Sequence, residues 1–279
     1  MKTYLDCIPC FVRQALEASK MATGNKIKQE KALKAVLSEL ENTSLKNKIP
    51  PQIARKVHRI VREVTKNNDP YKKVKDKYNR KALKMYPSLK RKVAKSKDRL
   101  LTATRLAIAG NIIDFGPGSK FDLEKTIEDV LIQDFAINHF NQFRKALNSS
   151  KKILYLGDNA GEIVFDRILL EELKDKEITF VVKGGPIIND ATVEDARFVG
   201  IDKIAKIEVV SNGDPDTGPA RRSKEFINKL QDADLVISKG QGNYEALSEV
   251  DADIFFLLKV KCPLIARDIG AKVGNIIIK

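Results

Sequence analysis

The chain has 279 residues, 43% of them hydrophobic and 32% charged, with three cysteines and no tryptophan. This length can bury a sizeable core, and the composition excludes collagen, a disulfide-rich scaffold and wholesale disorder. The longest wholly apolar runs, such as residues 254–258, are far shorter than the ~18 residues of a membrane helix. Asp6 and two nearby cysteines stand where a signal peptide would need an apolar core. These features argue against a membrane protein and against secretion. Three cysteines fit a reducing compartment, so we expect a cytoplasmic protein.

The charge is spread unevenly along the chain. Residues 1–150 carry 32 basic and 15 acidic residues, whereas residues 151–279 carry 19 and 22. Residues 55–99 alone hold 18 basic residues, four acidic residues and three tyrosines, a composition that a nucleic-acid surface can have. Because no nucleic-acid motif accompanies this stretch, we favour solvated helices, with a few cations facing an anionic substrate as a further alternative. The lysines that we expect to be solvated include Lys72, Lys75, Lys92 and Lys95.

The first half of the chain shows helical periodicity. Apolar residues recur at spacings of three and four in three stripes. The stripes are Phe11/Ala15/Ala18/Ala22, Leu33/Val36/Leu37/Leu40 and Ile53/Val57/Ile60/Val61/Val64. Residues 100–113 predict a buried helix that ends before a Gly-Pro-Gly breaker at 116–118, and a further helix pair is expected from Asp122 onward. No strand is predicted in this half.

After residue 150 the pattern changes to short apolar strands that alternate with helices. The predicted strands are Ile153–Leu156, Ile178–Val182, Ile207–Val210, Leu235–Ser238, Ile254–Leu258 and Gly274–Ile278. The predicted helices are Ile163–Leu173, Thr192–Val199, Ala220–Leu230, Tyr244–Ser248 and Pro263–Arg267. This alternation is typical of a mostly parallel sheet with helices on both faces. We therefore predict an α/β protein, in which an all-helical N-terminal domain (1–150) packs on a three-layer α/β/α domain (151–279).

Polar loops follow the predicted strands, and in a parallel sheet such loops meet at one edge. Three of these residues, Asp158, Asn159 and Asp190, offer hard oxygen ligands that suit Mg²⁺ or Mn²⁺ better than structural zinc. One Asp-Asn-x-Gly loop alone would more simply be a turn with a helix N-cap. Two acidic loops together with a Lys-Gly-x-Gly loop on one edge favour a metal site instead.

The same edge supplies groups for an anion. Lys239, Lys259 or Lys261 can meet the oxygens of a phosphate that the metal ion holds. Gly240, Gly242 and the helix beginning near Asn243 can add backbone N–H groups. The glycine pattern fits neither the Walker A motif nor the dinucleotide fingerprint, so we discount nucleotide binding of those kinds.

Several long motifs of this chain resemble one known family. They are Gly157-Asp158-Asn159-Ala160-Gly161-Glu162, Lys183-Gly184-Gly185-Pro186 with Asn189-Asp190-Ala191-Thr192, Ser238–Glu245, Leu258–Pro263 and Ala109–Gly116. The family is that of the metal-dependent damage-control phosphatases, once catalogued as domain of unknown function 89. The opening Cys7-Ile8-Pro9-Cys10-Phe11 resembles the branch with paired cysteines that is found in archaea and some bacteria.

The resemblance implies roles for individual residues. Asp158, Asn159 and Asp190 fall on the metal-binding positions, and Asn111 and Asp114 fall on a polar motif that the helical part adds to the pocket. The substrate-binding loop corresponds to Lys239, Gly240, Gln241, Gly242 and Asn243. Lys261 falls on a lysine that contacts phosphate, and Lys259 stands where other branches carry arginine, which keeps the charge but loses the bidentate geometry.

We therefore predict a metal-dependent phosphatase that hydrolyses phosphate monoesters of small metabolites, sugar phosphates in particular, in metabolite damage control. The cofactor is a divalent ion, either Mg, Mn or another first-row ion such as Co or Ni, with Asp158 and Lys261 as catalytic residues. Direct attack by water and an aspartyl-phosphate on Asp158 both remain open. The alternative function is a basic nucleic-acid-binding protein with an α/β ligand-sensing domain.

Other polar residues carry less specific signals. Cys7 and Cys10 can line a pocket or pack, bind a metal or form a redox pair, and the role of Cys262 is open as well. His58 and His139 lie in helical runs and are expected to be structural. Glu162 and Asp195 fit equally well as groups that hold the metal ligands and as ordinary acids at helix starts.

Overall fold

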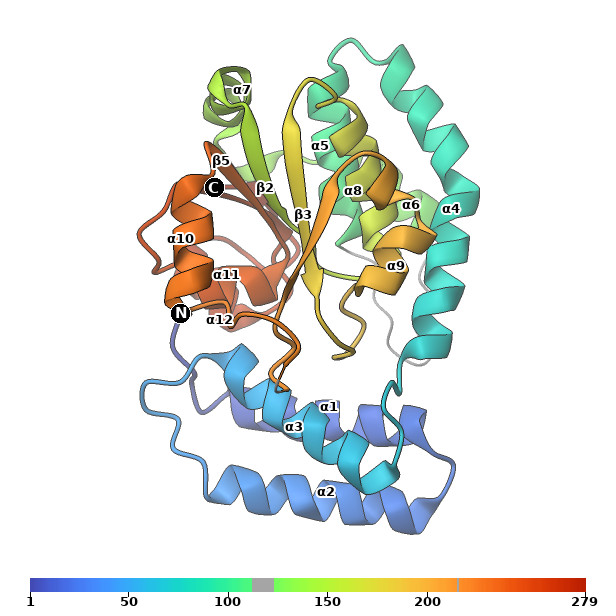
Figure 1. Ribbon diagram of the computed structural model, residues 1–279, viewed down its shortest axis with the longest axis vertical. Helices are drawn as coiled ribbons and strands as arrows, with labels where there is room; N and C mark the ends of the chain where they lie inside the picture. The colour runs from blue at the N-terminus through green and yellow to red at the C-terminus, as the bar shows by residue number, and fades with distance from the viewer. Residues whose placement is uncertain (112–122, 215) are drawn as a thin grey trace.

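The computed structural model describes residues 1–111, 123–214 and 216–279, and it is built on one seven-stranded sheet (Figure 1). The strands are β1 (Phe135–Asn138), β2 (Lys152–Leu156), β3 (Glu177–Lys183), β4 (Lys206–Val210), β5 (Leu235–Lys239), β6 (Ile254–Lys259) and β7 (Ile276–Ile278). Their order across the sheet is β1-β7-β6-β5-β2-β3-β4. Neighbours pair in parallel except β6 and β7, which are antiparallel.

The chain reverses its direction of travel across the sheet between β2 and β5. From β2 it moves outward through β3 to β4, and it then returns to place β5 on the other side of β2. At such a switch point the loops after the two central strands diverge and leave a crevice at their carboxyl ends. The loops that follow β2 and β5 therefore border the place where a parallel sheet ordinarily binds its ligand.

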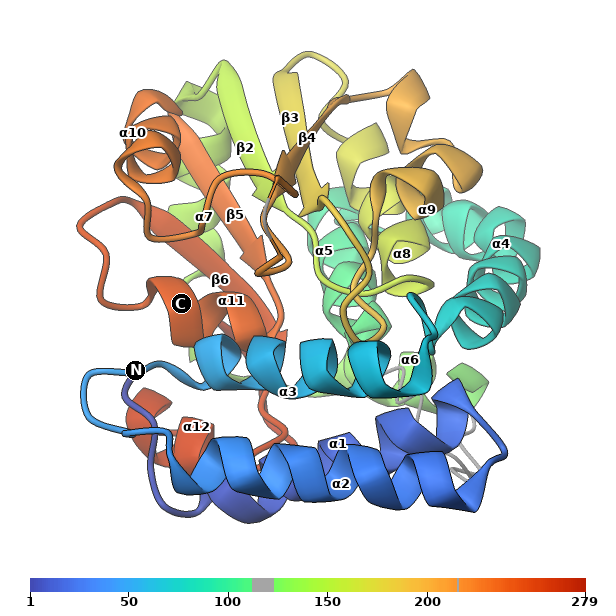
Figure 2. The same ribbon diagram turned by 60° about the horizontal axis from the view of Figure 1, so that its bottom comes forward.

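Helices surround the sheet on both faces and at one end. They are α1 (Cys7–Ala22), α2 (Lys26–Glu41), α3 (Pro50–Thr65), α4 (Lys72–Lys95), α5 (Arg99–Gly110), α6 (Leu123–Ile132), α7 (Phe140–Ser149), α8 (Glu162–Glu171), α9 (Val193–Phe198), α10 (Lys224–Asp232), α11 (Gln241–Leu247) and α12 (Pro263–Ile269), with a 3₁₀ turn at Ile201–Lys203. The first three helices form a group of their own, and Figure 2 shows α3 lying across the end of the sheet toward which β2 and β3 point. This group therefore faces the crevice at the carboxyl ends of the strands.

The strands are apolar on both faces because helices cover both sides of the sheet. In β2, Ile153 and Tyr155 pack into a core formed with α4, α5 and α8. The alternate residues, Leu154 and Leu156, pack into a second core formed with the first three helices and with α10, α11 and α12. Because α1–α3 share a core with the sheet, their position over the crevice is fixed by apolar packing. Within the described ranges, no helix has the length and apolar character needed to cross a bilayer.

The predicted fold class is confirmed, and all six strands predicted after residue 150 are present. One element corrects the expectation of an all-helical N-terminal part: β1, at Phe135–Asn138, joins the sheet. It is only four residues long, and its partner β7 lies about 140 residues later in the chain, so local periodicity does not reveal it. The division into domains at residue 150 stays a prediction. The packing of α5 against α8 joins the two parts closely.

The basic stretch is mostly solvated on the long helix α4, where Lys72, Lys92 and Lys95 are exposed. The expectation is wrong for Lys75, which is 3% exposed. Its ammonium group forms ion pairs with Asp69 at 2.9 Å and with Asp195 at 3.3 Å. These partners explain its burial, because a lysine is rarely buried unless it is paired.

Candidate active site

The loops after β2 and β3 bring Asp158 and Asp190 together. The N–H of Ala191 donates to the carbonyl oxygen of Asp158 at 2.9 Å, and the N–H of Ala160 donates to the carbonyl oxygen of Asn189 at 2.9 Å. Asn159 and Asp190 also form an isolated β-bridge. Backbone hydrogen bonds therefore hold the three predicted metal ligands next to one another, although 32 residues separate the two aspartates.

The Asp158 carboxyl group is half-buried and lies close to two other acidic side chains. Burial raises its pKa to about 8, with further contributions from the charges of Glu162 and Asp190. Lys261 and Arg221 act in the opposite direction but do not offset these effects. A site that gathers carboxylates in this way attracts a cation.

Two amide side chains fix the orientation of the acidic groups. Asn111, at the end of α5, donates from Nδ2 to Asp158 Oδ2 at 3.1 Å and to Glu162 Oε2 at 3.1 Å. Asn159 donates from Nδ2 to the same two acceptors, each at 2.9 Å. Because the Asn159 amide uses its nitrogen here, its Oδ1 is the atom that can face a metal ion. Glu162 thus contacts one of the predicted metal ligands, Asn159, which agrees with one of the two roles that its sequence position suggests. Asp114 lies outside the described residues.

Lys239 lies behind the carboxylates, away from the cavity. Its Nζ donates to the Ala107 carbonyl oxygen at 2.8 Å, to Glu162 at 2.8 Å and to Asp166 at 2.5 Å. All three of its hydrogens are thereby used, and its side chain is fully buried. Although burial lowers its pKa, Asp166 and Glu162 outweigh this effect and raise it. The structure therefore does not place the Lys239 ammonium group where a substrate phosphate can reach it.

Asp166 is a member of this network that sequence analysis missed. It accepts from Lys239 and, at 2.8 Å, from the hydroxyl group of Tyr155. Burial raises its pKa to about 7, with Lys239 acting in the opposite direction. Asp166 follows Glu162 by four residues and therefore shares its helix face, which is the signal that could have identified it.

The loop after β5 packs directly against Asp158. Gly240 has a φ of 77°, and a Cβ at this position would lie 1.8 Å from Asp158 Oδ2. Next to it, Asn243 donates from Nδ2 to the Gly157 carbonyl oxygen at 3.2 Å, which connects the loops after β2 and β5. Gly240 therefore allows the loop backbone to approach Asp158, and the Asn243 side chain holds this loop against the loop after β2.

We expect Gly240→Ala to lower the stability of the protein by about 2 kcal/mol or more, since the new methyl group clashes with the Asp158 carboxylate at a positive φ. The measurement is urea unfolding followed by circular dichroism. Gly242→Ala is the matched control, because nothing lies within 4 Å of a Cβ there and its φ is not positive. If the two variants unfold alike, the close packing at Gly240 has no energetic importance.

The remaining predicted residues lie near this loop. Gln241 accepts a hydrogen bond from the N–H of Lys261, whose side chain is exposed. Lys259 is half-buried, and burial together with the charge of Lys261 lowers its pKa. In the part of the chain that the structure describes, neither lysine is among the residues that line the cavity at Asp158 and Asp190, although the charge of Lys261 acts on Asp158.

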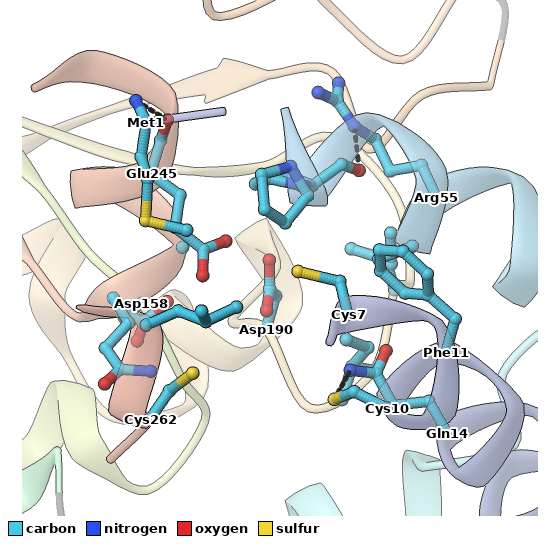
Figure 3. Close-up of a pocket in the computed structure, with 18 of the residues that line it drawn as sticks. Met1, Cys7, Cys10, Phe11, Gln14, Arg55, Asp158, Asp190, Glu245 and Cys262 are labelled. Atoms are coloured by element: carbon cyan, nitrogen blue, oxygen red, sulfur yellow. Dashed lines mark hydrogen bonds between the residues drawn. The ribbon is translucent and has the colours of Figure 1, made fainter. Parts of the chain in front are cut away.

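A cavity of about 250 Å³ opens over Asp158 and Asp190 (Figure 3). Three basic side chains line it. They are Arg55 from α3, Lys183 at the end of β3 and Arg221 before α10. Lys183 lies 3.5 Å from an Asp190 oxygen, and burial lowers its pKa to about 7. None of these three residues has a role that the sequence alone predicts. Arg55 and Arg221 belong to no motif at the end of a strand, so only the fold brings them to the site.

All three cysteines line the same cavity. Cys7 and Cys10 belong to the first turn of α1, and Cys262 precedes α12, with the three side chains around one space in Figure 3. All three are free thiols, and burial raises the pKa of Cys7. Among the described residues, no group of three His, Cys, Asp or Glu side chains is arranged to hold a metal ion. Of the alternatives predicted for Cys7 and Cys10, the structure favours a cavity-lining role.

The other polar residues in question have structural partners. Asp195 forms a capping box with Thr192 at the start of α9 and accepts hydrogen bonds from Lys75 and Asn79. It is therefore a helix-start acid that also attaches α4. His58 is buried, which lowers its pKa to about 3, and its Nε2 lies 3.3 Å from Gln14 Oε1. This environment agrees with the structural role expected for His58.

Comparisons with known proteins assign this arrangement to one family. The family model of the damage-control phosphatase ARMT1-like domain matches residues 3–277. A damage-control phosphatase of Pyrococcus horikoshii is 36% identical over 99% of this chain and 97% of its own length. One of Archaeoglobus fulgidus is 36% identical over 98% of this chain and 97% of its own length. An uncharacterized protein of Methanocaldococcus jannaschii is 40% identical over 98% and 94%.

A solved structure extends the similarity to three dimensions. The crystal structure of a protein from Pyrococcus horikoshii, of the family with domain of unknown function 89, has a TM-score of 0.88 and 34% sequence identity. The match covers 100% of this chain and 98% of the other. The similarity therefore includes the helical group over the crevice as well as the sheet.

Proposed function

Because this chain belongs to the damage-control phosphatase ARMT1-like family, and thus acts as a phosphatase in damage control, we propose that its activity depends on a divalent metal ion. The metal ligands that we propose are Asp158, Asn159 and Asp190. The substrates are phosphate monoesters of small metabolites, sugar phosphates among them. The observation that carries the proposal is the juxtaposition of Asp158 and Asp190 at the crevice beside β2.

The residues present fit such an ion. Two carboxylates and one amide oxygen are hard ligands, which suit Mg²⁺, Mn²⁺ or another first-row ion such as Co²⁺ or Ni²⁺. The raised pKa of Asp158 supports the same conclusion, since a cation would relieve the repulsion between this carboxylate and its acidic neighbours. When bound, the ion would supply Lewis-acid chemistry and make a water molecule more acidic.

The protein residues have distinct proposed roles around the ester. Lys183 and Arg221 line the cavity beside the aspartates and would bind the negative oxygens of the phosphate. Lys261 keeps the phosphate-contacting role that its motif implies, while Lys259 adds positive charge from further away. Asn111 would hold the Asp158 carboxylate in one orientation. Asp158 can then serve as a metal ligand and as a catalytic group in either of the two mechanisms.

The loop after β5 has a shaping role in this proposal. Gly240 allows the close approach to Asp158, and Gln241 and Gly242 line the cavity, while Asn243 holds the loop in place. Lys239 acts through Glu162 as a positioning residue. We also propose a cytoplasmic location, since a reducing compartment would keep the three cavity cysteines as thiols.

The test is a screen of phosphate release from sugar phosphates and nucleotides, with each divalent ion added in turn to the purified protein. We expect release from at least some sugar phosphates with one or more of these ions. No release from any ester with any ion would contradict the proposed activity.

A charge-reversal variant tests whether the basic helix α4 takes part in the reaction. Lys73, Lys77, Lys92 and Lys95 are all exposed on this helix. We expect their joint replacement by glutamate to leave kcat/KM for a sugar phosphate within a few-fold, because water and salt screen exposed charges. A loss as large as that caused by removing a metal ligand would mean that α4 guides the substrate electrostatically.

A further inference from the structure

A second cavity, of about 260 Å³, lies beside the active-site cavity and has five basic residues in its walls, of which Lys56 is paired with Glu39 and Arg222 with Glu249. Among the described residues that line it, none is acidic. The basic ones are Arg55, Lys56, Arg59, Arg221 and Arg222. A cavity lined in this way is suited to an anion.

Two arginines connect the two cavities. Arg55 and Arg221 line both of them, so the cavities share these side chains as a common wall. In Figure 3, Arg55 lies on the opposite side of the active-site cavity from Asp158. A molecule with one end at the aspartates would therefore extend toward this arginine and the basic cavity beyond it.

The shared arginines have no acidic partner within the parts of the chain that the structure describes. Arg55 donates from Nε to the Pro51 carbonyl oxygen at 3.0 Å, and Arg221 donates from Nη1 to the Gly242 carbonyl oxygen at 3.2 Å. No carboxylate of the described residues lies within 4.0 Å of either guanidinium group, although Arg62 nearby is paired with Asp214. The charge of Asp190 acts on both guanidinium groups, and those of Asp158 and Glu245 act on Arg221, but no ion pair uses their remaining N–H donors, which can bind an anion.

Arg221 is buried and Arg55 is half-buried. Arg221 is 6% exposed, and burial lowers its pKa, as it lowers that of Arg55 to about 10. Gly213 packs against the aliphatic part of Arg55 so closely that a Cβ there would lie 2.6 Å from Arg55 Cδ. The Arg55 side chain is therefore held in position before any ligand binds.

We propose that the basic cavity binds a second anionic group of the substrate, a phosphate or carboxylate remote from the ester that is hydrolysed. This inference rests on the proposed function and adds a substrate class to it, namely phosphate esters with two anionic ends. Arg55, on the wall between the two cavities, would attract that group by its charge, while Arg221 would bind the ester phosphate beside the aspartates. Arg59 lines the second cavity alone and would give that group its charged hydrogen bond, since its own partner Glu63 is 3.9 Å away and exposed.

The test compares substrates that differ only in the second anionic group. One pair is fructose 6-phosphate and fructose 1,6-bisphosphate, and the other is glycerol 3-phosphate and 3-phosphoglycerate. We expect the doubly anionic member of at least one pair to have about tenfold higher kcat/KM, mainly through KM, which corresponds to one charged hydrogen bond. A preference in the first pair identifies a phosphate, and one in the second pair identifies a carboxylate.

A variant shows whether the basic cavity causes the preference. Arg59→Gln should remove most of it and leave kcat/KM of the singly anionic member within about twofold. Arg91→Gln, on the exposed face of α4, is the matched control and should change neither value. Equal kcat/KM within both pairs, or an equal loss for both members in Arg59→Gln, would overturn the inference.

A binding measurement separates this inference from the proposed function. Titration calorimetry in chelator follows the binding of fructose 1,6-bisphosphate and fructose 6-phosphate without turnover. We expect the bisphosphate to bind about tenfold more tightly to the wild type and to lose this advantage in Arg59→Gln. Equal affinities would overturn the inference, whereas failure of every ester to be hydrolysed would overturn the proposed function alone.

Discussion

Lys239→Met is expected to lower the free energy of unfolding by about 3–5 kcal/mol, the cost of leaving buried charges without their partner. Lys239, Glu162 and Asp166 are all fully buried, and the ammonium group is the cation that both carboxylates contact. Methionine fills a similar volume, so the loss of charge dominates the effect. The measurement is urea unfolding followed by circular dichroism.

The control is Lys151→Met, which removes a lysine whose ion pair with Glu177 is exposed on both sides. We expect a change below about 1 kcal/mol there, because water already solvates both charges. Comparable losses in the two variants would show that the network behind the active site contributes no more than a surface ion pair. The account of Lys239 as a positioning residue would then be wrong.

Asp190→Asn is expected to reduce kcat/KM by about a hundredfold or more and to weaken metal binding. The substitution keeps the size of the side chain and removes one of the two charges that we assign to the ion. The fold should persist, because Asp190 is 18% exposed and lies in a loop at the edge of the sheet. Phosphate release and titration calorimetry with Mn²⁺ measure the two effects.

Asp202→Asn provides the comparison for Asp190→Asn. Asp202 is exposed in the 3₁₀ turn that precedes β4, outside the cavity. Its substitution should leave both metal affinity and turnover unchanged. An Asp190→Asn protein that binds Mn²⁺ as tightly as this control would refute the assignment of Asp190 as a ligand.

The α/β half of the fold was predictable because its strands are buried on both faces. Ile153–Leu156 and Ile254–Leu258 stand out as apolar runs bounded by polar loops, and both are strands in the structure. β1 escaped prediction since four residues with alternating exposure carry too little signal, and its pairing with β7 is non-local. The docking of α3 across the crevice also depends on contacts between distant segments.

Some parts of the candidate site were predictable from the sequence, and others were not. The juxtaposition of Asp158, Asn159 and Asp190 was predictable, because the loops after parallel strands share an edge. The position of Lys239 was not, although it lies on the same face of β5 as Leu235 and Ile237, which pack toward α5 and α8. Both faces of β5 are apolar, so the sequence does not tell which face opens to the cavity.

The cavity arginines show a different limit. Arg55 lies in a helix of the basic N-terminal part, and Arg221 lies in a loop about 165 residues later. Their convergence requires the first three helices to pack over the sheet edge, which no local motif indicates. The excess of positive charge in the sequence suggested that a few cations face an anionic substrate, but it did not show which ones.

The most direct test of a metal-dependent phosphatase is phosphate release by the wild-type protein after removal of metal. The protein is stripped with chelator, assayed with the best sugar phosphate from the screen, and assayed again after Mg²⁺, Mn²⁺, Co²⁺ or Ni²⁺ is added in excess. We expect release to fall to background in chelator and to return with at least one ion, since the carboxylates at Asp158 and Asp190 need a cation to receive a phosphate. Undiminished release in chelator would contradict the account.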